Sequence, residues 1–194
     1  MKNWHCLNKK ELRKKFISLR NGLDEVYVAQ SSAEISKRVQ SLQVYQDAKT
    51  VMIYISYRNE VSTVDLIKSA LSAGKRVCVP AVTNIDKAEM EAFEISTIGD
   101  ADETVLGICQ PNPKTALKIS KAEIDLTIIP GIVFDERGFR IGYGKGFFDR
   151  RLKGMNKSRV IGLAYDFQII KEILVDACDE AVGGIVSQTR ILKL

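Results

Sequence analysis

Hydrophobic residues over roughly the first forty positions recur every three or four residues, the spacing of an amphipathic helix. Asn8 and Glu11 have the spacing of a capping box at the start of one such stretch, and Gly22 can end it. Asp24 can cap a second stretch that runs to about Leu42. The pattern therefore predicts two N-terminal helices, each with one apolar face.

After residue 49 the pattern changes to short apolar runs separated by helical stretches. The runs that predict strands are Thr50–Ile55, Arg76–Val82, Met90–Ile95, Asp125–Pro130, Arg159–Tyr165 and a final one near Gly184–Ser187. The stretches that predict helices begin at Ser62-Thr63, at Phe147 and near Phe167.

Near-continuous apolar strands that alternate with helices indicate a mostly parallel sheet covered on both faces. We therefore expect an α/β fold with three α/β/α layers, in which the N-terminal helices pack on the central sheet. Met90–Ile95 alternates in polarity and should lie at the edge of the sheet. With no linker or repeat in the sequence, residues 1–194 should form a single domain.

Composition excludes several classes of protein. Of the 194 residues, 45% are hydrophobic, which is enough for a sizeable core, but no apolar run is long enough to cross a membrane. The N-terminus has no apolar signal-peptide core, so we expect a cytoplasmic protein without a membrane partner. The net charge of +5 favours anionic ligands. Because basic and acidic residues are interspersed, we expect no nucleic-acid partner, and we expect a monomer.

Histidine and cysteine offer little for catalysis. The four cysteines, Cys6, Cys78, Cys109 and Cys178, form no C-x-x-C pair, and Cys78 lies in an apolar run typical of the core. The single histidine, His5, lies close to the N-terminus. Histidine metal sites and Ser-His-Asp triads therefore do not fit this chain. Its chemistry must come from carboxylates, cations, backbone N–H groups and any metal that these bind.

The segment Gly138–Arg150 carries four glycines among cations, directly after an apolar run. Glycines let backbone N–H groups converge on an anion. The segment fits neither familiar phosphate motif, because Phe147 replaces the third glycine of the dinucleotide fingerprint and Gly146 replaces the Ser or Thr of the Walker motif. A glycine-rich hairpin is the alternative, but these alternating glycines exceed what a hairpin needs. The segment predicts a phosphate site, with Asp149 placed to meet a metal ion.

Two further features stand outside this segment. Lys9, Arg13 and Arg20 share one face of the first predicted helix, which for an ordinary helix indicates a solvated basic face. Glu60 follows the first predicted strand, where α/β proteins bind ligands. A carboxylate there can accept paired hydrogen bonds from an N–H-rich ligand such as a pterin, although an exposed loop carboxylate is the plainer interpretation.

Four motifs then follow one another along the chain. Lys9–Arg13 matches K-x-x-L-R, Tyr54–Thr63 ends in E-[IV]-x-T, Pro130–Arg150 contains PG-x-x-FD followed by the glycines, and Tyr165–Gln168 matches [YF]-[DE]-x-Q. In this order the motifs resemble those of the 5-formyltetrahydrofolate cyclo-ligases, also called methenyltetrahydrofolate synthetases, from about residue 9 to residue 192. Phe147-Phe148 departs from the usual Tyr-Tyr, and the acidic segment near Asp179 is degenerate.

This resemblance implies a reaction. ATP and 5-formyltetrahydrofolate would give 5,10-methenyltetrahydrofolate, ADP and phosphate, with Mg²⁺ required and an imidoyl phosphate formed on the formyl oxygen. Phosphoryl transfer depends mainly on positioning and electrostatics, which agrees with the scarcity of histidine.

The resemblance also implies roles for individual residues. Those implied to bind ATP are Lys9, Arg13, Arg140, Gly142, Tyr143, Gly144, Lys145, Gly146 and Asp149. Those implied to bind the folate are Ile55, Glu60 and Tyr143, and those implied in catalysis are Lys145, Arg140 and Tyr143. Asp149 would hold Mg²⁺, with Asp179 as a second ligand. Packing within the loop is the alternative role for Tyr143.

Two other functions stay open at this stage. A non-catalytic nucleotide- or RNA-binding module would account for the basic first helix. A sugar-phosphate isomerase or transferase on a similar scaffold would account for the phosphate loop. The joint presence of Lys9, Arg13, Glu60, Lys145 and Asp149 favours the cyclo-ligase.

Overall fold

The two N-terminal helices form where the apolar spacing predicts them. In the computed structural model, which describes residues 7–193, Asn8 caps α1 (Lys9–Asn21). The Asn8 side chain accepts hydrogen bonds from the backbone N–H groups of Lys10 and Glu11, and the Glu11 carboxylate accepts one from the N–H of Asn8. Asp24 caps α2 (Glu25–Ser41) by accepting from the N–H of Tyr27. Both predicted caps are confirmed.

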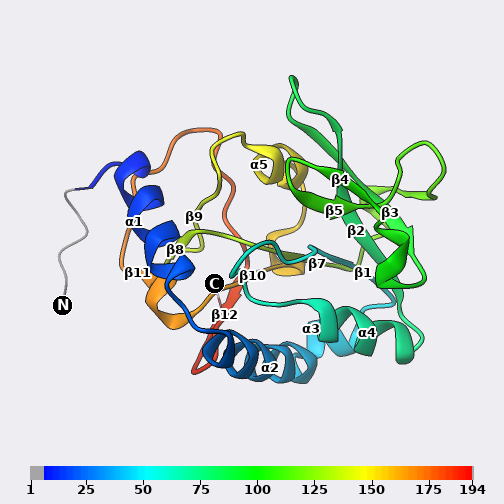
Figure 1. Cartoon of the computed structure of the whole chain (residues 1–194), viewed down its shortest axis with the longest axis horizontal. Coiled ribbons are helices and arrows are strands. Elements are labelled where there is room, and N and C mark those ends of the chain that lie inside the picture. Colours follow the sequence, from blue (N-terminus) through cyan, green and yellow to red (C-terminus); the bar gives the residue numbers. More distant parts are fainter. Residues whose placement is uncertain (1–6, 194) are drawn as a thin grey trace.

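An eight-stranded sheet lies at the centre of the molecule, with the strand order β13-β12-β10-β7-β1-β2-β3-β6 (Figure 1). The strands are β1 (Thr50–Ile53), β2 (Arg76–Asn84), β3 (Glu89–Ile95), β6 (Lys118–Ile119), β7 (Leu126–Ile129), β10 (Val160–Leu163), β12 (Gly184–Val186) and β13 (Ile191–Lys193). The run from β12 to β2 pairs in parallel, and the outer pairs are antiparallel. The predicted, mostly parallel sheet is confirmed.

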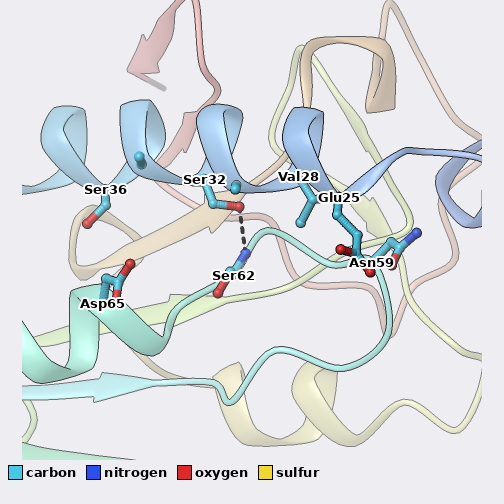
Figure 2. Close-up of a pocket in the computed structure, with 9 residues that line it drawn as sticks. Glu25, Val28, Ser32, Ser36, Asn59, Ser62 and Asp65 are labelled. Atoms are coloured by element: carbon cyan, nitrogen blue, oxygen red, sulfur yellow. Dashed lines mark hydrogen bonds between the residues drawn. The ribbon is translucent and has the colours of Figure 1, made fainter.

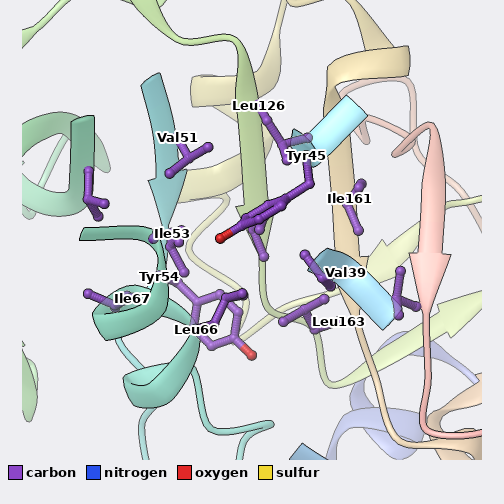
Figure 3. Close-up of a cluster of buried hydrophobic side chains, with 14 of the residues drawn as sticks. Val39, Tyr45, Val51, Ile53, Tyr54, Leu66, Ile67, Leu126, Ile161 and Leu163 are labelled. Carbon is purple, nitrogen blue, oxygen red and sulfur yellow. The ribbon is translucent and has the colours of Figure 1, made fainter. Parts of the chain in front are cut away.

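Helices cover both faces of this sheet. The helices α2, α3 (Gln43–Asp47) and α4 (Val64–Ser72) lie along one face, and α5 (Phe147–Leu152) covers part of the other (Figure 1). Figure 3 shows Val39 and Tyr45 from the helices packed against Val51 and Leu126 from the strands. The three-layer α/β/α arrangement is therefore confirmed.

A second, three-stranded sheet has the order β11-β8-β9, from β11 (Ile169–Ile170), β8 (Val133–Asp135) and β9 (Arg140–Ile141). Helix α1 packs on this smaller sheet through Leu12 and Phe16, whereas α2 packs on the central one. The predicted helix near Phe167–Leu174 is wrong. A 3-10 turn, η4 (Asp166–Gln168), and then β11 stand there, because β11 pairs with β8 and the carboxylate of Asp135 accepts from the N–H of Ile173.

The predicted edge position of Met90–Ile95 is also wrong. Strand β3 is covered by β6, through the pair Ala92 and Ile119, and β13 adds a strand beyond β12. The remaining short elements are the hairpin β4 (Glu103–Val105) with β5 (Ile108–Gln110) and the 3-10 turns η1 (Ile98–Asp100), η2 (Lys121–Glu123) and η3 (Lys157–Arg159).

Cys78 lies in the core as predicted, and burial raises the pKa of its thiol to about 12. The predictions on His5 and Cys6 concern residues outside those that the structure describes. Among residues 7–193, no helix has the length and apolar character needed to cross a bilayer.

The ring of Phe134 fills the space between two glycines on neighbouring segments. A Cβ atom at Gly131 or at Gly162 would overlap this buried ring. Phe134 lies in β8, the first strand of the hairpin that leads into the glycine-rich loop of residues 142–146. Its position therefore fixes this loop against strand β10. Only glycine at position 162 leaves room for it.

Gly162→Ala should therefore destabilise the protein by about 1–3 kcal/mol, as expected for overpacking. Urea denaturation measures this, with Gly22→Ala as the control, because a Cβ at Gly22 would make only ordinary contacts, the nearest at 3.5 Å. Adding Phe134→Leu should recover part of the loss, since the two sites are in contact. Equal stability of Gly162→Ala and wild type would contradict this packing.

Candidate functional site

Lys9 is held by two carboxylates from a distant segment. Its Nζ lies 2.6 Å from Oδ2 of Asp176 and also contacts Asp179. Burial alone would lower the pKa of Lys9, but these two hydrogen-bonded carboxylates raise it above its usual value. The first turn of α1 is thereby tied to the loop that precedes β12.

Arg13 connects α1 to the glycine loop, residues 142–146. Its Nε donates to the carbonyl oxygen of Gly142 at 2.8 Å. Gly144 has φ +102°, and a Cβ there would lie 3.5 Å from the Arg13 guanidinium carbon. The loop thus bends in a glycine conformation directly beside a cation, as the sequence predicts for a phosphate site.

Lys145 lies at the tip of the glycine loop. It is exposed, and its ammonium makes no hydrogen bond or ion pair with residues 7–193. The next residue, Gly146, has φ +71° and caps α5. The guanidinium of Arg150 donates to the carbonyl oxygen of Lys145 at 2.8 Å, which steadies the backbone while the lysine side chain stays available.

Arg140 and Asp149 form a partly buried ion pair beneath the loop. Nη2 of Arg140 lies 3.2 Å from Oδ1 of Asp149, and Nη1 donates to the carbonyl oxygen of Glu180. Burial lowers the pKa of Arg140, against the opposing effect of Asp149 and Asp179. Oδ1 of Asp149 also accepts from the N–H of Glu180 at 3.3 Å.

Asp149 is the better placed of the two predicted metal ligands. Its second carboxylate oxygen, Oδ2, makes no hydrogen bond within residues 7–193, whereas Asp179 is engaged by Lys9. Within those residues no group of three or more histidine, cysteine or carboxylate side chains is arranged to hold a metal. A single carboxylate fits Mg²⁺ that is bound mainly through substrate phosphates and water.

Glu60, Tyr143 and Arg20 meet in a second cluster. The Tyr143 hydroxyl donates to Oε1 of Glu60 at 3.1 Å and accepts from Nη2 of Arg20. Nη1 of Arg20 lies 3.6 Å from the same Glu60 oxygen, and Oε2 of Glu60 accepts from the N–H of Tyr57. Glu60 is 5% exposed, so the interpretation of it as an exposed loop carboxylate is wrong.

Burial dominates the titration of Glu60. It raises the pKa above the usual value of 4.5, against the opposing effects of Arg20, the N–H of Tyr57 and the Tyr143 hydroxyl. Burial also raises the pKa of Tyr143, with Glu60 acting in the same direction. Because the pKa of Tyr143 is raised from a value already near 10, the hydroxyl keeps its proton at neutral pH and can donate it to Glu60.

The structure brings most of the predicted residues into two neighbouring clusters. One holds Lys9, Arg140, Asp149 and Asp179, and the other holds Glu60 and Tyr143. The glycine loop joins the two, because Gly142 contacts Arg13 and the next residue contacts Glu60. Ile55 is half-buried at the border of the main core.

Sequence reasoning gave no role to Arg20 or Asp176. Arg20 shares a helix face with Arg13, but that face predicts solvent exposure, whereas Arg20 is 1% exposed. Asp176 lies in an irregular acidic segment with no motif around it.

Neither of two hollows detected on the surface is lined by the glycine loop. One, of about 260 Å³, lies between α2 and residues 59–65, where Oγ of Ser32 accepts from the N–H of Ser62 (Figure 2). The other, of about 480 Å³, is bordered by Glu94 and Asp100. Within the clusters the charged groups contact one another.

Comparisons with known proteins identify the family of this chain. Residues 6–188 match the model of the 5-formyltetrahydrofolate cyclo-ligase family. A probable 5-formyltetrahydrofolate cyclo-ligase from Schizosaccharomyces pombe is 30% identical over 206 residues, covering 96% of this chain and 98% of the relative. One from Caenorhabditis elegans is 27% identical over 189 residues, covering 92% and 91%.

Solved structures are similar as well. The 5,10-methenyltetrahydrofolate synthetase of Aquifex aeolicus superimposes with a TM-score of 0.83 at 27% identity, over 95% of this chain and 92% of that one. The synthetase of Mycoplasma pneumoniae gives a TM-score of 0.75 at 25% identity, over 94% and 99%.

The buried position of Glu60 predicts a pH effect on stability. Because the folded-state pKa is raised, ionisation of Glu60 costs stability as the pH rises from below 4.5 through the folded pKa. The free energy of unfolding of wild type minus that of Glu60→Gln should therefore be larger near about pH 4 than near about pH 7. Urea denaturation of both proteins at each pH measures this difference.

Asp100→Asn is the control, because the pKa of Asp100 is shifted in the opposite direction to that of Glu60. The backbone N–H groups of Thr97 and Ser96 hold the pKa of Asp100 below its usual 3.8, so its contribution is lost only as the pH falls below that value. If the free energy of unfolding of wild type minus that of Glu60→Gln stays constant or rises with pH, the account of Glu60 as a buried ionisable carboxyl is contradicted.

Proposed function

The chain belongs to the 5-formyltetrahydrofolate cyclo-ligase family, and we propose that it uses ATP to cyclise 5-formyltetrahydrofolate to 5,10-methenyltetrahydrofolate, releasing ADP and phosphate. One observation carries the proposal. The glycine loop touches a cationic cluster through Gly142 and a buried carboxylate through Tyr143. A single short loop thus lies between groups suited to a polyphosphate and a group suited to a pterin.

The ATP half consists of α1 and the glycine loop. Lys9, Arg13 and Lys145 supply positive charge, and Gly142, Gly144 and Gly146 allow the backbone to curve around phosphate oxygens. Arg140, buried under the loop, adds charge from below. Lys9 would leave Asp176 and Asp179 to reach the phosphates, since both contacts are ionic and Asp176 is largely exposed.

Asp149 would hold Mg²⁺ through its unengaged carboxylate oxygen, directly or through water. When bound, the ion would neutralise negative charge on the ATP phosphates. Asp179 becomes available for the same role only when Lys9 moves away, which would couple ATP binding to completion of the metal site.

Glu60 marks the folate half. Its carboxylate suits the adjacent N–H groups on the edge of a reduced pterin, and Tyr143 and Ile55 would flank the ring. Burial increases the strength of such hydrogen bonds, because the local dielectric is low.

The chemistry then follows from positioning. The formyl oxygen attacks the γ-phosphorus of ATP and ADP leaves, while Lys145 and Arg140 stabilise the charge on the transferring group. N10 of the folate attacks the activated formyl carbon and loses its proton. The attack of N10 closes the ring, and phosphate then departs with the former formyl oxygen. No histidine is needed, because the nucleophiles belong to the substrates.

The non-catalytic and sugar-phosphate alternatives leave the Glu60 cluster without a purpose. We also propose that the enzyme acts in the cytoplasm as a monomer, without a nucleic-acid or membrane partner.

Purified protein with Mg-ATP and 5-formyltetrahydrofolate should develop the near-ultraviolet absorbance of the methenyl product. Lys145→Ala should lower kcat by about 100- to 1,000-fold, because a charge on the transition state is removed. Its dissociation constant for the folate should stay within about twofold of wild type, since Glu60 is untouched.

Lys153→Ala, which removes another exposed lysine from the adjoining segment, is the control and should retain turnover. Absence of product at high wild-type concentration would contradict the activity itself. An unchanged kcat for Lys145→Ala would contradict only the role of that lysine.

Removal of divalent cations by a chelator should abolish turnover, and added Mg²⁺ should restore it. Asp149→Asn should raise the Mg²⁺ concentration for half-maximal turnover by about 10- to 100-fold or more, since loss of even an indirect metal contact costs this much. Binding of ATP without Mg²⁺ serves as the control for a folded site. An unaltered Mg²⁺ requirement in the variant would show that Asp149 does not hold the metal.

A further inference from the structure

Arg20 is a buried charged side chain beside the folate cluster that the proposed chemistry leaves unused. It lies near the end of α1 and is 1% exposed. Its Nη2 donates to the Tyr143 hydroxyl, but Nε and Nη1 make no hydrogen bond within residues 7–193. Nη1 lies 3.6 Å from Oε1 of Glu60, in the cluster assigned to the folate.

A buried guanidinium with two N–H-bearing nitrogens that make no hydrogen bond needs an acceptor. Tyr57 and Tyr143 already hydrogen-bond Glu60, so this carboxylate does not require Arg20 as a donor to be satisfied. The unused donors of Arg20 therefore point to a ligand group beside Glu60.

The Tyr143 hydroxyl indicates what kind of group fits there. It accepts a hydrogen bond from Arg20 and donates one to Glu60. A ligand that joins the same two side chains must likewise present an acceptor to Arg20 and, next to it, a donor to Glu60.

The edge of a 2-amino-4-oxopterin has this order of groups. Its C4 oxygen accepts, the neighbouring N3–H donates, and the 2-amino group donates next in line. Glu60 has further lone pairs for the two donors even while Oε2 keeps the N–H of Tyr57.

We propose that Arg20 and Glu60 bind the pterin edge together, Arg20 donating to the C4 oxygen and Glu60 accepting from N3–H and the 2-amino group. This rests on the proposed folate substrate. The Tyr143 hydroxyl and the pterin edge compete for the same two partners, so Tyr143 turns aside when the folate binds. Arg20 is thus a substrate-contacting residue that selects a 4-oxo over a 4-amino pterin, because a 4-amino group would set its N–H groups against those of the guanidinium.

The test compares 5-formyltetrahydrofolate with its 4-amino-4-deoxy counterpart, which presents a donor in place of the C4 oxygen and an acceptor in place of N3–H. Calorimetry measures the dissociation constant of each for wild type, Arg20→Met and Arg20→Lys. Wild type should bind the 4-oxo ligand more tightly. Arg20→Met should weaken that ligand by about 10- to 100-fold while leaving the 4-amino ligand unchanged or tighter, so that selectivity falls by at least that factor and the preference that remains is the one that Glu60 gives through N3–H. The selectivity of Arg20→Lys should lie between those of wild type and Arg20→Met, because an ammonium still donates but lacks the planar geometry of a guanidinium.

Arg38→Met is the matched control, since it removes another arginine, on α2, that pairs with a carboxylate. It should leave the ratio of the two dissociation constants unchanged. Equal weakening of both ligands in Arg20→Met and Arg20→Lys would overturn the proposal and indicate a structural role only. If Arg20→Met does not fold, the ratio in Arg20→Lys decides. Failure of wild type to bind 5-formyltetrahydrofolate would instead contradict the proposed function.

Discussion

Two of the buried arginine side chains, those of Arg20 and Arg140, lie in the site, and its arrangement depends on their need for partners. A buried charge is costly unless it is paired and hydrogen-bonded. Arg20 meets part of this need with Tyr143 and Glu60, and Arg140 pairs with Asp149 and a carbonyl of the segment before β12. Segments far apart in the sequence therefore converge on the glycine loop.

The position of α1 follows from the same constraint. By packing on the small sheet instead of the central one, α1 turns its cationic face toward the loop, so that Arg13 reaches Gly142 and Lys9 reaches Asp179. A helix that appears solvated in the sequence thereby becomes one wall of the site. The absence of catalytic histidine is consistent with a reaction in which the protein supplies positions and fixed charges.

Elements defined by local signals could be predicted from the sequence. The caps at Asn8 and Asp24 depend on neighbouring backbone N–H groups, and the parallel strands are continuous apolar runs. Strand β11 could not be predicted, because two isoleucines become a strand only through pairing with β8. The edge strands β6 and β13 are equally short and depend on tertiary pairing. In the site, the glycine loop and Asp149 carry a local motif, whereas the burial of Arg20 depends on Glu60, which approaches only after folding.

The central claim is that the site brings the formyl oxygen of the folate to the γ-phosphorus of ATP. Turnover of 5-formyltetrahydrofolate labelled with heavy oxygen in the formyl group tests it most directly, with mass spectrometry of the phosphate released. The label should appear in inorganic phosphate, one atom for each methenyl product formed. Unlabelled phosphate, with the heavy oxygen released to water, would contradict direct transfer between the two halves of the site.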